Sequence, residues 1–187
     1  MKPTAKKPAG WTAIRQHLTT LDKPALVALL KDLYEANSGN RDFLQARCQA
    51  EESGGAALES YRKKIVEQFF PSRGMFGKLK LGEARKAIRD YRKATGNVPG
   101  TAELLMTYVE KGVEFTNEYG DIDERFYSSI ESALDELAAL LRTHEGLYPQ
   151  FADRLDKVEQ LTDGIGWGFH DFIAGVASQL KDELSSS

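Results

Sequence analysis

Apolar residues recur three or four positions apart along most of this 187-residue chain, and turn-forming residues separate the runs. That spacing places the apolar side chains on one face of an α-helix. We therefore expect an all-α fold of about eight amphipathic helices. Most connections between them are short, which favours antiparallel neighbours. The predicted architecture is therefore an irregular antiparallel bundle or an array of α-hairpins.

Start and stop signals place the predicted helices along the chain. Their approximate ranges are 22–37, 40–52, 56–70, 84–95, 101–119, 123–144, 149–161 and 167–184. Asp22 and Thr101 are the expected N-caps of two of them, because their side-chain oxygens can accept a hydrogen bond from the first turn. Gly96 is expected to end its helix in the left-handed conformation. The stretch 72–81 contains glycines and has no amphipathic period, so it is predicted to be a loop.

The domain organisation follows from the two ends and from the length of the helical part. Residues 1–10 combine three lysines with two prolines and no apolar stretch, so we expect a disordered N-terminal tail. Residues 11–184 are expected to form a single helical domain, with 71–81 as the place where two lobes would meet. No apolar run approaches the roughly 18 residues of a membrane-spanning helix, so no membrane association is expected. Cys48 is the only cysteine, which excludes an intrachain disulfide and favours a cytoplasmic location.

The formal net charge of -3 conceals an uneven distribution along the chain. Residues 62–93 contain eleven basic and three acidic residues, whereas residues 94–187 contain six basic and eighteen acidic residues. A chain polarised in this way either presents its basic face to an anion or pairs its two halves with one another.

The basic segment contains a candidate anion-binding site at the start of a predicted helix. Its residues are Lys78, Lys80, Arg85, Arg89 and Arg92. The three arginines fall at spacings of four and three, which gives a cationic ridge of the kind that follows a phosphate backbone.

An acidic ridge on the next predicted helix offers a competing interpretation of the same residues. It consists of Glu103, Glu110, Glu114 and Glu118. Two sequential antiparallel helices with opposed ridges would pair internally, and each exposed pair would contribute less than about 1 kcal/mol. We favour internal pairing or a merely solvated face over anion binding, and the sequence pI of 5.7 also weighs against a nucleic-acid partner.

Three carboxylates surround a predicted turn at Gly120. Glu114, Asp121 and Asp123 supply the oxygen ligands that a hard divalent cation prefers, although their spacing is not that of an EF-hand. The favoured alternative is structural. In that interpretation Gly120 ends one helix and Asp121 or Asp123 caps the next, where a carboxylate also suits the positive helix end.

Glycines alternate with other residues around Trp167, at positions 164, 166 and 168. No strand precedes them and no Lys-Ser or Lys-Thr pair follows, so a nucleotide-binding phosphate loop is rejected. The imidazole of His170 suits a metal ligand or a general base. The adjacent Asp171 cannot orient it, however, since neighbouring helix positions do not face each other. We favour a structural, hydrogen-bonded His170.

The chain resembles a bacterial family that is catalogued only as a domain of unknown function. The resemblance rests on residues 21–34, 84–91 and 113–127 and on Gly166 to Asp171, and it covers most of the chain after the first ten residues. It implies one compact helical unit in a bacterial cytosol. It implies no activity, cofactor or catalytic residue.

Three functional hypotheses follow from these features. The leading one is a non-catalytic helical binding or scaffold protein that takes a protein partner or associates with itself, without a cofactor. The second is anion or nucleic-acid binding through the basic segment. The third is a metal-dependent hydrolase built from Glu114, Asp121, Asp123 and His170.

Overall fold

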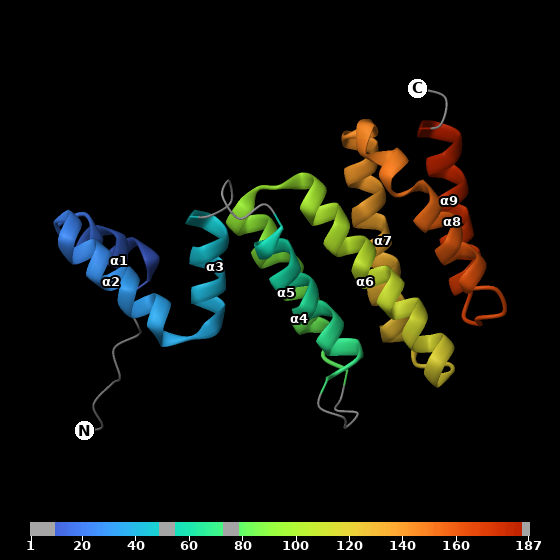
Figure 1. Cartoon of the computed structure of the whole chain (residues 1–187), viewed down its shortest axis with the longest axis horizontal. Coiled ribbons are helices and arrows are strands. Elements are labelled where there is room, and N and C mark those ends of the chain that lie inside the picture. The colour runs from blue at the N-terminus through green and yellow to red at the C-terminus, as the bar shows by residue number, and fades with distance from the viewer. Residues whose placement is uncertain (1–9, 49–54, 73–78, 185–187) are drawn as a thin grey trace, which may run out of the picture. The chain divides into compact units, whose positions relative to one another are not determined.

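A computed structural model describes residues 10–48, 55–72 and 79–184 (Figure 1). The described residues form helices and no strand, so the predicted all-α fold is confirmed. The helices are α1 (Trp11–Leu18), α2 (Lys23–Ala36), α3 (Ser38–Cys48), α4 (Ala56–Phe69), α5 (Leu81–Thr95), α6 (Val98–Tyr119), α7 (Glu124–Thr143), the 3-10 helix η1 (Glu145–Gln150), α8 (Ala152–Leu161) and α9 (Phe169–Leu184). The tail expected over residues 1–10 lies, apart from Gly10, outside the described residues.

Several helix ends agree with the sequence signals and one does not. The Ala25 amide donates to Asp22 Oδ1 over 2.8 Å, and Gly96 ends α5 with φ at 64°. The prediction that Thr101 caps α6 is wrong. The cap is Asn97, whose side chain accepts from the Gly100 amide over 2.7 Å, and Pro99 is tolerated in the first turn that follows.

The chain divides into two compact units, residues 1–44 and 45–187. In the second unit α6 lies at the centre and packs against α4, α5, α7 and α8 (Figure 1). Its buried residues include Leu104, Leu105, Tyr108 and Val109, which form much of the core. The segment 71–81 lies within this unit, and the helices on either side of it, α4 and α5, pack against each other.

A glycine sets the close approach of α6 and α7. A Cβ atom added at Gly112 would lie 2.8 Å from Cγ1 of Ile130, a fully buried residue of α7. Four residues earlier on α6, the Tyr108 hydroxyl is 2.7 Å from Ser129 Oγ. The two helices are therefore joined by a tight apolar contact and by a hydrogen bond.

The N-terminal unit contains α1, α2 and the beginning of α3. No residue of α1 or α2 is buried. The turn between α2 and α3 is held by Asn40, whose Nδ2 donates to the Leu33 carbonyl over 2.8 Å. The Arg41 guanidinium lies 5.3 Å from the centre of the Tyr34 ring. These contacts order the turn, but they supply no apolar core.

None of the helices in the described part of the chain has the length and apolar character needed to cross a membrane.

Candidate binding surfaces

The structure separates the residues of the predicted basic ridge. Lys78 lies outside the described residues. The Arg85 side chain is only 14% exposed, pairs with Glu136 of α7 and lies 5.6 Å from the centre of the Tyr108 ring. Its Nη1 atom is buried and has no hydrogen-bond partner within the described residues. Arg85 is therefore part of the α5–α7 contact and is not available to a phosphate.

Lys80, Arg89 and Arg92 lie on the surface. Lys80 precedes α5, and the two arginines follow on α5 itself. Three of the five predicted anion-binding residues are thus exposed, without the arginine that would have joined them into one ridge.

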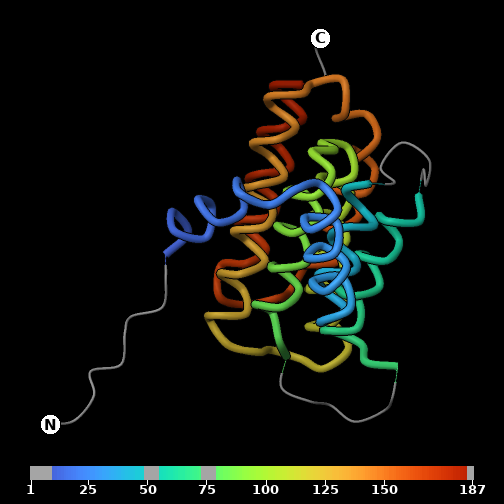
Figure 2. The backbone as a smooth tube through the Cα atoms, turned by 90° about the vertical axis from the view of Figure 1, so that its left-hand side faces the viewer, coloured from blue at the N-terminus to red at the C-terminus, as the bar shows by residue number. Residues whose placement is uncertain are grey.

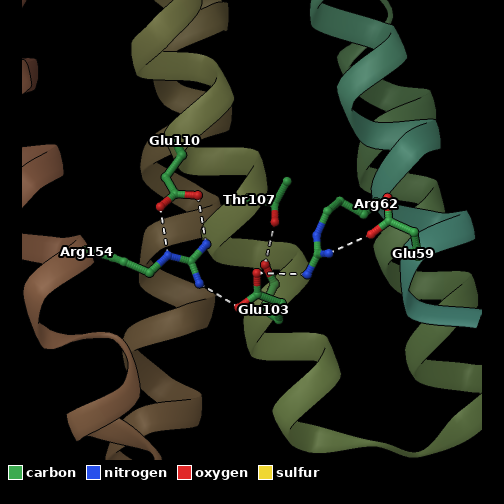
Figure 3. A network of polar contacts seen from close by, with 6 residues as sticks. All are labelled: Glu59, Arg62, Glu103, Thr107, Glu110 and Arg154. Carbon is green, nitrogen blue, oxygen red and sulfur yellow. Dashed lines mark hydrogen bonds and ion pairs between the residues drawn. The ribbon is translucent and has the colours of Figure 1, made fainter. Parts of the chain in front are cut away.

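Internal ion pairing does occur, but with partners other than those expected. Arg62 of α4 donates to Glu59 over 2.6 Å and to Glu103 of α6 over 3.1 Å (Figure 3). The acidic ridge of α6 thus meets α4. The pairing predicted between the ridges of α5 and α6 is wrong for Arg85, which turns towards α7 instead.

Arg154 of α8 is the residue that the sequence interpretation missed. Its Nε and Nη2 donate to the two carboxylate oxygens of Glu110 over 2.8 and 2.7 Å, and its Nη1 donates to Glu103 over 2.5 Å (Figure 3). The hydrogen bonds to Glu110 and then to Glu103 raise the pKa of Arg154 above its ordinary value, although burial acts against them. The bidentate geometry fixes both helices. Its only signal in the sequence was a basic residue within the acidic half of the chain.

A groove of about 680 Å³ runs between α6 and α8. Val113, Val158 and Leu161 supply its apolar surface. Its polar lining residues are Glu110, Lys111, Glu114, Asn117, Glu118, Arg154 and Lys157. Asn117 closes one part of it by donating from Nδ2 to the Leu161 carbonyl over 2.8 Å. Arg154 and Lys111 are each paired with a glutamate of the same lining, Glu110 and Glu114.

The carboxylates of the predicted metal site each have another role. Glu114 pairs with Lys111, and Asp121 accepts a hydrogen bond from the Tyr127 hydroxyl over 3.0 Å. Asp123 caps α7 by accepting from the Phe126 amide over 2.9 Å, as the structural interpretation predicted.

His170 is also engaged in a local hydrogen bond. The Thr162 hydroxyl lies 2.7 Å from the Glu159 carbonyl and 3.0 Å from His170 Nδ1, within hydrogen-bond distance of both. Among the residues that the structure describes, no three His, Cys, Asp or Glu side chains are grouped so as to hold a metal ion. The structure thus does not bring His170, Glu114, Asp121 and Asp123 together as a ligand set.

Two sequence motifs that are distant along the chain meet at one end of the second unit. They are the α6–α7 connection and the α8–α9 connection, which lie at the same end in both views (Figure 1 and Figure 2). Tyr127 joins them, because its hydroxyl donates to Asp121 while its ring lies 4.9 Å from that of Phe169. Burial raises the pKa of Tyr127, which keeps its hydroxyl protonated as a donor. A Cβ atom at Gly166 would lie 3.8 Å from Asp121 Oδ2.

Trp167 is held in an unusual backbone conformation within this end. Its φ is 63°, the one positive φ of a non-glycine residue in the described part of the chain. A left-handed conformation costs a bulky L-residue roughly 1–2 kcal/mol. The side chain is nevertheless 64% exposed, so little burial offsets that cost.

Most of the exposed large hydrophobic residues of the described chain belong to the N-terminal unit. Its exposed large hydrophobic residues are Trp11, Ile14, Val27, Leu29, Leu30 and Leu33. The described part of the second unit, although it is much longer, has only three such residues: Tyr119, Leu161 and Trp167. Exposed apolar surface is therefore concentrated in α1 and α2.

Comparison with known proteins found no match to this chain among protein-family profiles, curated proteins or solved structures.

Proposed function

We propose that this chain is a non-catalytic helical binding protein, with scaffolding as its role, and that its N-terminal unit docks onto an apolar surface of a protein partner. The observation that carries the proposal is the exposed apolar surface of α1 and α2, two helices without a buried residue. Large apolar side chains that are exposed on neighbouring turns of one helix, as on α2, generally mark an interaction surface.

The residues of α2 have the spacing that a helix uses to bind another apolar surface. Leu26, Leu29, Leu30 and Leu33 follow at i, i+3, i+4 and i+7, and we call them the apolar stripe. Leu26 is half-buried, whereas the other three are exposed. Lys31 and Asp32 lie on the opposite side of the helix, so the stripe has a polar back.

The magnitude of burial supports docking. Fully burying a leucine side chain contributes roughly 1.5–3 kcal/mol, and each exposed leucine of the stripe has about half of its surface left to bury. Three of them together with Val27 would contribute about 4 kcal/mol, before the cost of association. Trp11 and Ile14 of α1 would add to this if the partner reaches them.

A partner would also stabilise the helices of the N-terminal unit. Helices shorter than about 12–15 residues are marginal in water unless an apolar face is packed. α1 has 8 residues and α2 has 14, and neither has a buried side chain. A partner that covers the apolar stripe would supply the tertiary packing that these helices lack.

Two substitutions on one helix test the proposal. Leu30→Glu places a carboxylate in the apolar stripe, whereas Ala28→Glu places the same group at an exposed position on the polar side. Tagged wild-type chain and both variants are isolated from the cells that produce the protein, together with a differently tagged second copy. We expect one bound protein, a partner or the second copy, to be retained by Ala28→Glu and reduced at least about ten-fold by Leu30→Glu. Equal retention by the two variants would refute the proposed surface.

We include a bacterial cytoplasm in this proposal. The single cysteine supports a reducing compartment, because Cys48 is exposed and has no second cysteine in the chain with which to form a disulfide. The bacterial source rests on the family resemblance alone.

A further inference from the structure

The exposed large hydrophobic residues of the second unit lie at one end of its helices. Tyr119 is the last residue of α6, Leu161 is the last residue of α8, and Trp167 lies in the α8–α9 connection. Asn117, two residues before Tyr119, donates a hydrogen bond to the Leu161 carbonyl and so joins the ends of α6 and α8. Gly166, next to Trp167, approaches Asp121 of the α6–α7 connection. We call Tyr119, Leu161 and Trp167 the aromatic end surface.

Carboxylates outnumber cations around the aromatic end surface, where Arg125 and Lys157 are the basic residues next to the two acidic ranges. Residues 114–124 contain five acidic residues and residues 159–171 contain three, and neither range contains a lysine or arginine. Within the described part of the chain, Lys111 is the one cation that pairs with any of these eight carboxylates, and its partner is Glu114. The remaining seven leave a negative field around the exposed rings.

We propose that the aromatic end surface docks a basic segment of a partner protein, in which lysine or arginine residues adjoin at least one apolar side chain. The apolar side chain would pack on Trp167 and Leu161, while the cations would face the surrounding carboxylates. Arginine and lysine also bind favourably over the face of an exposed indole ring. Phosphate-bearing partners are disfavoured at this surface, because its charge has the same sign as theirs.

The basic helix α5 of a second copy is a poorer occupant than a separate basic segment. Its exposed residues include Lys86, Arg89 and Arg92, which match the charge of the aromatic end surface. No large hydrophobic side chain of α5 is exposed, however, so this helix offers nothing to cover Trp167. The surface requires both a positive charge and an apolar side chain on the same partner.

The α6–α8 groove extends the same surface along the bundle. Leu161 belongs to both, and Glu118 lines the groove one residue before Tyr119. A segment that is anchored on Trp167 and passes Leu161 would therefore reach the groove between α6 and α8. A groove between two helices suits a peptide segment.

The two tryptophans of the chain provide a direct assay. Trp11 and Trp167 are exposed to similar extents, 68% and 64%, but lie in different units. In a Trp11→Phe chain, all tryptophan fluorescence comes from Trp167. The probe is a synthetic peptide in which arginine alternates with leucine, and its controls replace either arginine by glutamate or leucine by serine. We expect the probe alone to shift the Trp167 emission to shorter wavelength, with an affinity that falls as salt is raised.

Matched variants show where the probe binds. The affinity of each variant for the fluorescein-labelled probe is measured by fluorescence anisotropy. Trp167→Ala should weaken it at least about ten-fold, whereas Trp11→Ala should leave it unchanged. Neutralising Glu118 and Asp163 together as Glu118→Gln and Asp163→Asn should weaken it, whereas Asp135→Asn with Asp182→Asn, two exposed carboxylates elsewhere, should not. These positions are exposed, so the variants should keep the wild-type circular dichroism.

Several results would overturn this proposal. One is equal affinity of the wild-type and Trp167→Ala chains for the probe. Another is equal affinity of the wild-type chain for the probe and for the glutamate peptide. A third is self-association that Trp167→Ala abolishes, because a second copy would then be the occupant. The inference does not depend on the N-terminal unit. Leu30→Glu should bind the basic probe as the wild type does, so failure of the apolar stripe and failure of the aromatic end surface are separable.

Discussion

Removing the Arg154 guanidinium should destabilise the second unit by substantially more than removing a surface arginine. Arg154→Met keeps most of the apolar stem but deletes three hydrogen bonds to Glu110 and Glu103. Glu103 retains Arg62, whereas Glu110 is left without a cationic partner among the described residues. The substitution therefore leaves one carboxylate without its partner at the contact between α6 and α8.

The exposure of the groups sets the magnitude. The Arg154 side chain is 30% exposed and that of Glu103 is 24% exposed. Fully exposed pairs contribute less than about 1 kcal/mol, and breaking a buried pair costs about 3–5 kcal/mol. A bidentate pair with partial solvent screening lies between these limits, so the free energy of unfolding should fall by about 2 kcal/mol. Arg142→Met is the control, because the Arg142 and Glu183 side chains are 39% and 49% exposed and their loss should cost about 0.5 kcal/mol or less.

Urea denaturation followed by circular dichroism at 222 nm measures both effects. With a slope of about 2 kcal/mol/M, Arg154→Met should lower the midpoint by about 1 M and Arg142→Met by less than about 0.3 M. A double-mutant cycle with Glu110→Gln should show a coupling of about 1 kcal/mol. Equal midpoints for the two arginine variants, or strict additivity with Glu110→Gln, would refute the role of Arg154 in joining the helices.

Two further predictions concern helix packing and pH. Gly112→Ala should lower the free energy of unfolding by about 1 kcal/mol. The added Cβ would clash with Ile130, and the cost of that clash exceeds the gain in helix propensity. Gly175→Ala in α9, where a Cβ meets nothing within 4 Å, should instead raise the free energy of unfolding. Thermal denaturation midpoints that move in the same direction for both variants would contradict this prediction. Burial, and then the neighbouring Asp135, raise the pKa of Glu131 above its ordinary 4.5, so ionisation of this group weakens the fold as pH rises through that raised value. Glu131→Gln should therefore raise the urea midpoint at pH 7 but not at pH 4, and the same difference at both pH values would exclude this cause.

The periodic pattern predicted the helices well, because a long amphipathic helix repeats its signal over several turns. It predicted their ends less well. At the start of α6 both Asn97 and Thr101 have side chains that can cap, and the choice depends on a backbone path that Pro99 permits. α1 has only 8 residues, too few for a clear period, and it was not predicted.

The partners of charged residues could not be predicted from adjacent helices. Because α6 is central, its glutamates meet α4 and α8 as well as its neighbours in sequence. Arg154 is 51 residues from Glu103, and nothing in the spacing of either residue specifies that contact. Likewise, the meeting of Asp121 with Gly166 required the tertiary arrangement of four helices.

The sequence correctly predicted the structural role of the polar residues that form helix ends. Gly120 ends α6 and Asp123 caps α7, as helix-end chemistry requires. Trp167 was placed at a helix start, whereas it lies before α9 with a positive φ.

Binding of a partner to the apolar stripe can be detected in living cells with a photo-activated cross-linker incorporated at a single position. One chain has the cross-linker in place of Leu30 and a second has it in place of Ala28, two exposed positions on different sides of α2. If the apolar stripe is a binding surface, position 30 gives one cross-linked product of defined mass and position 28 gives none. Products from both positions in equal amount, or from neither, would contradict it.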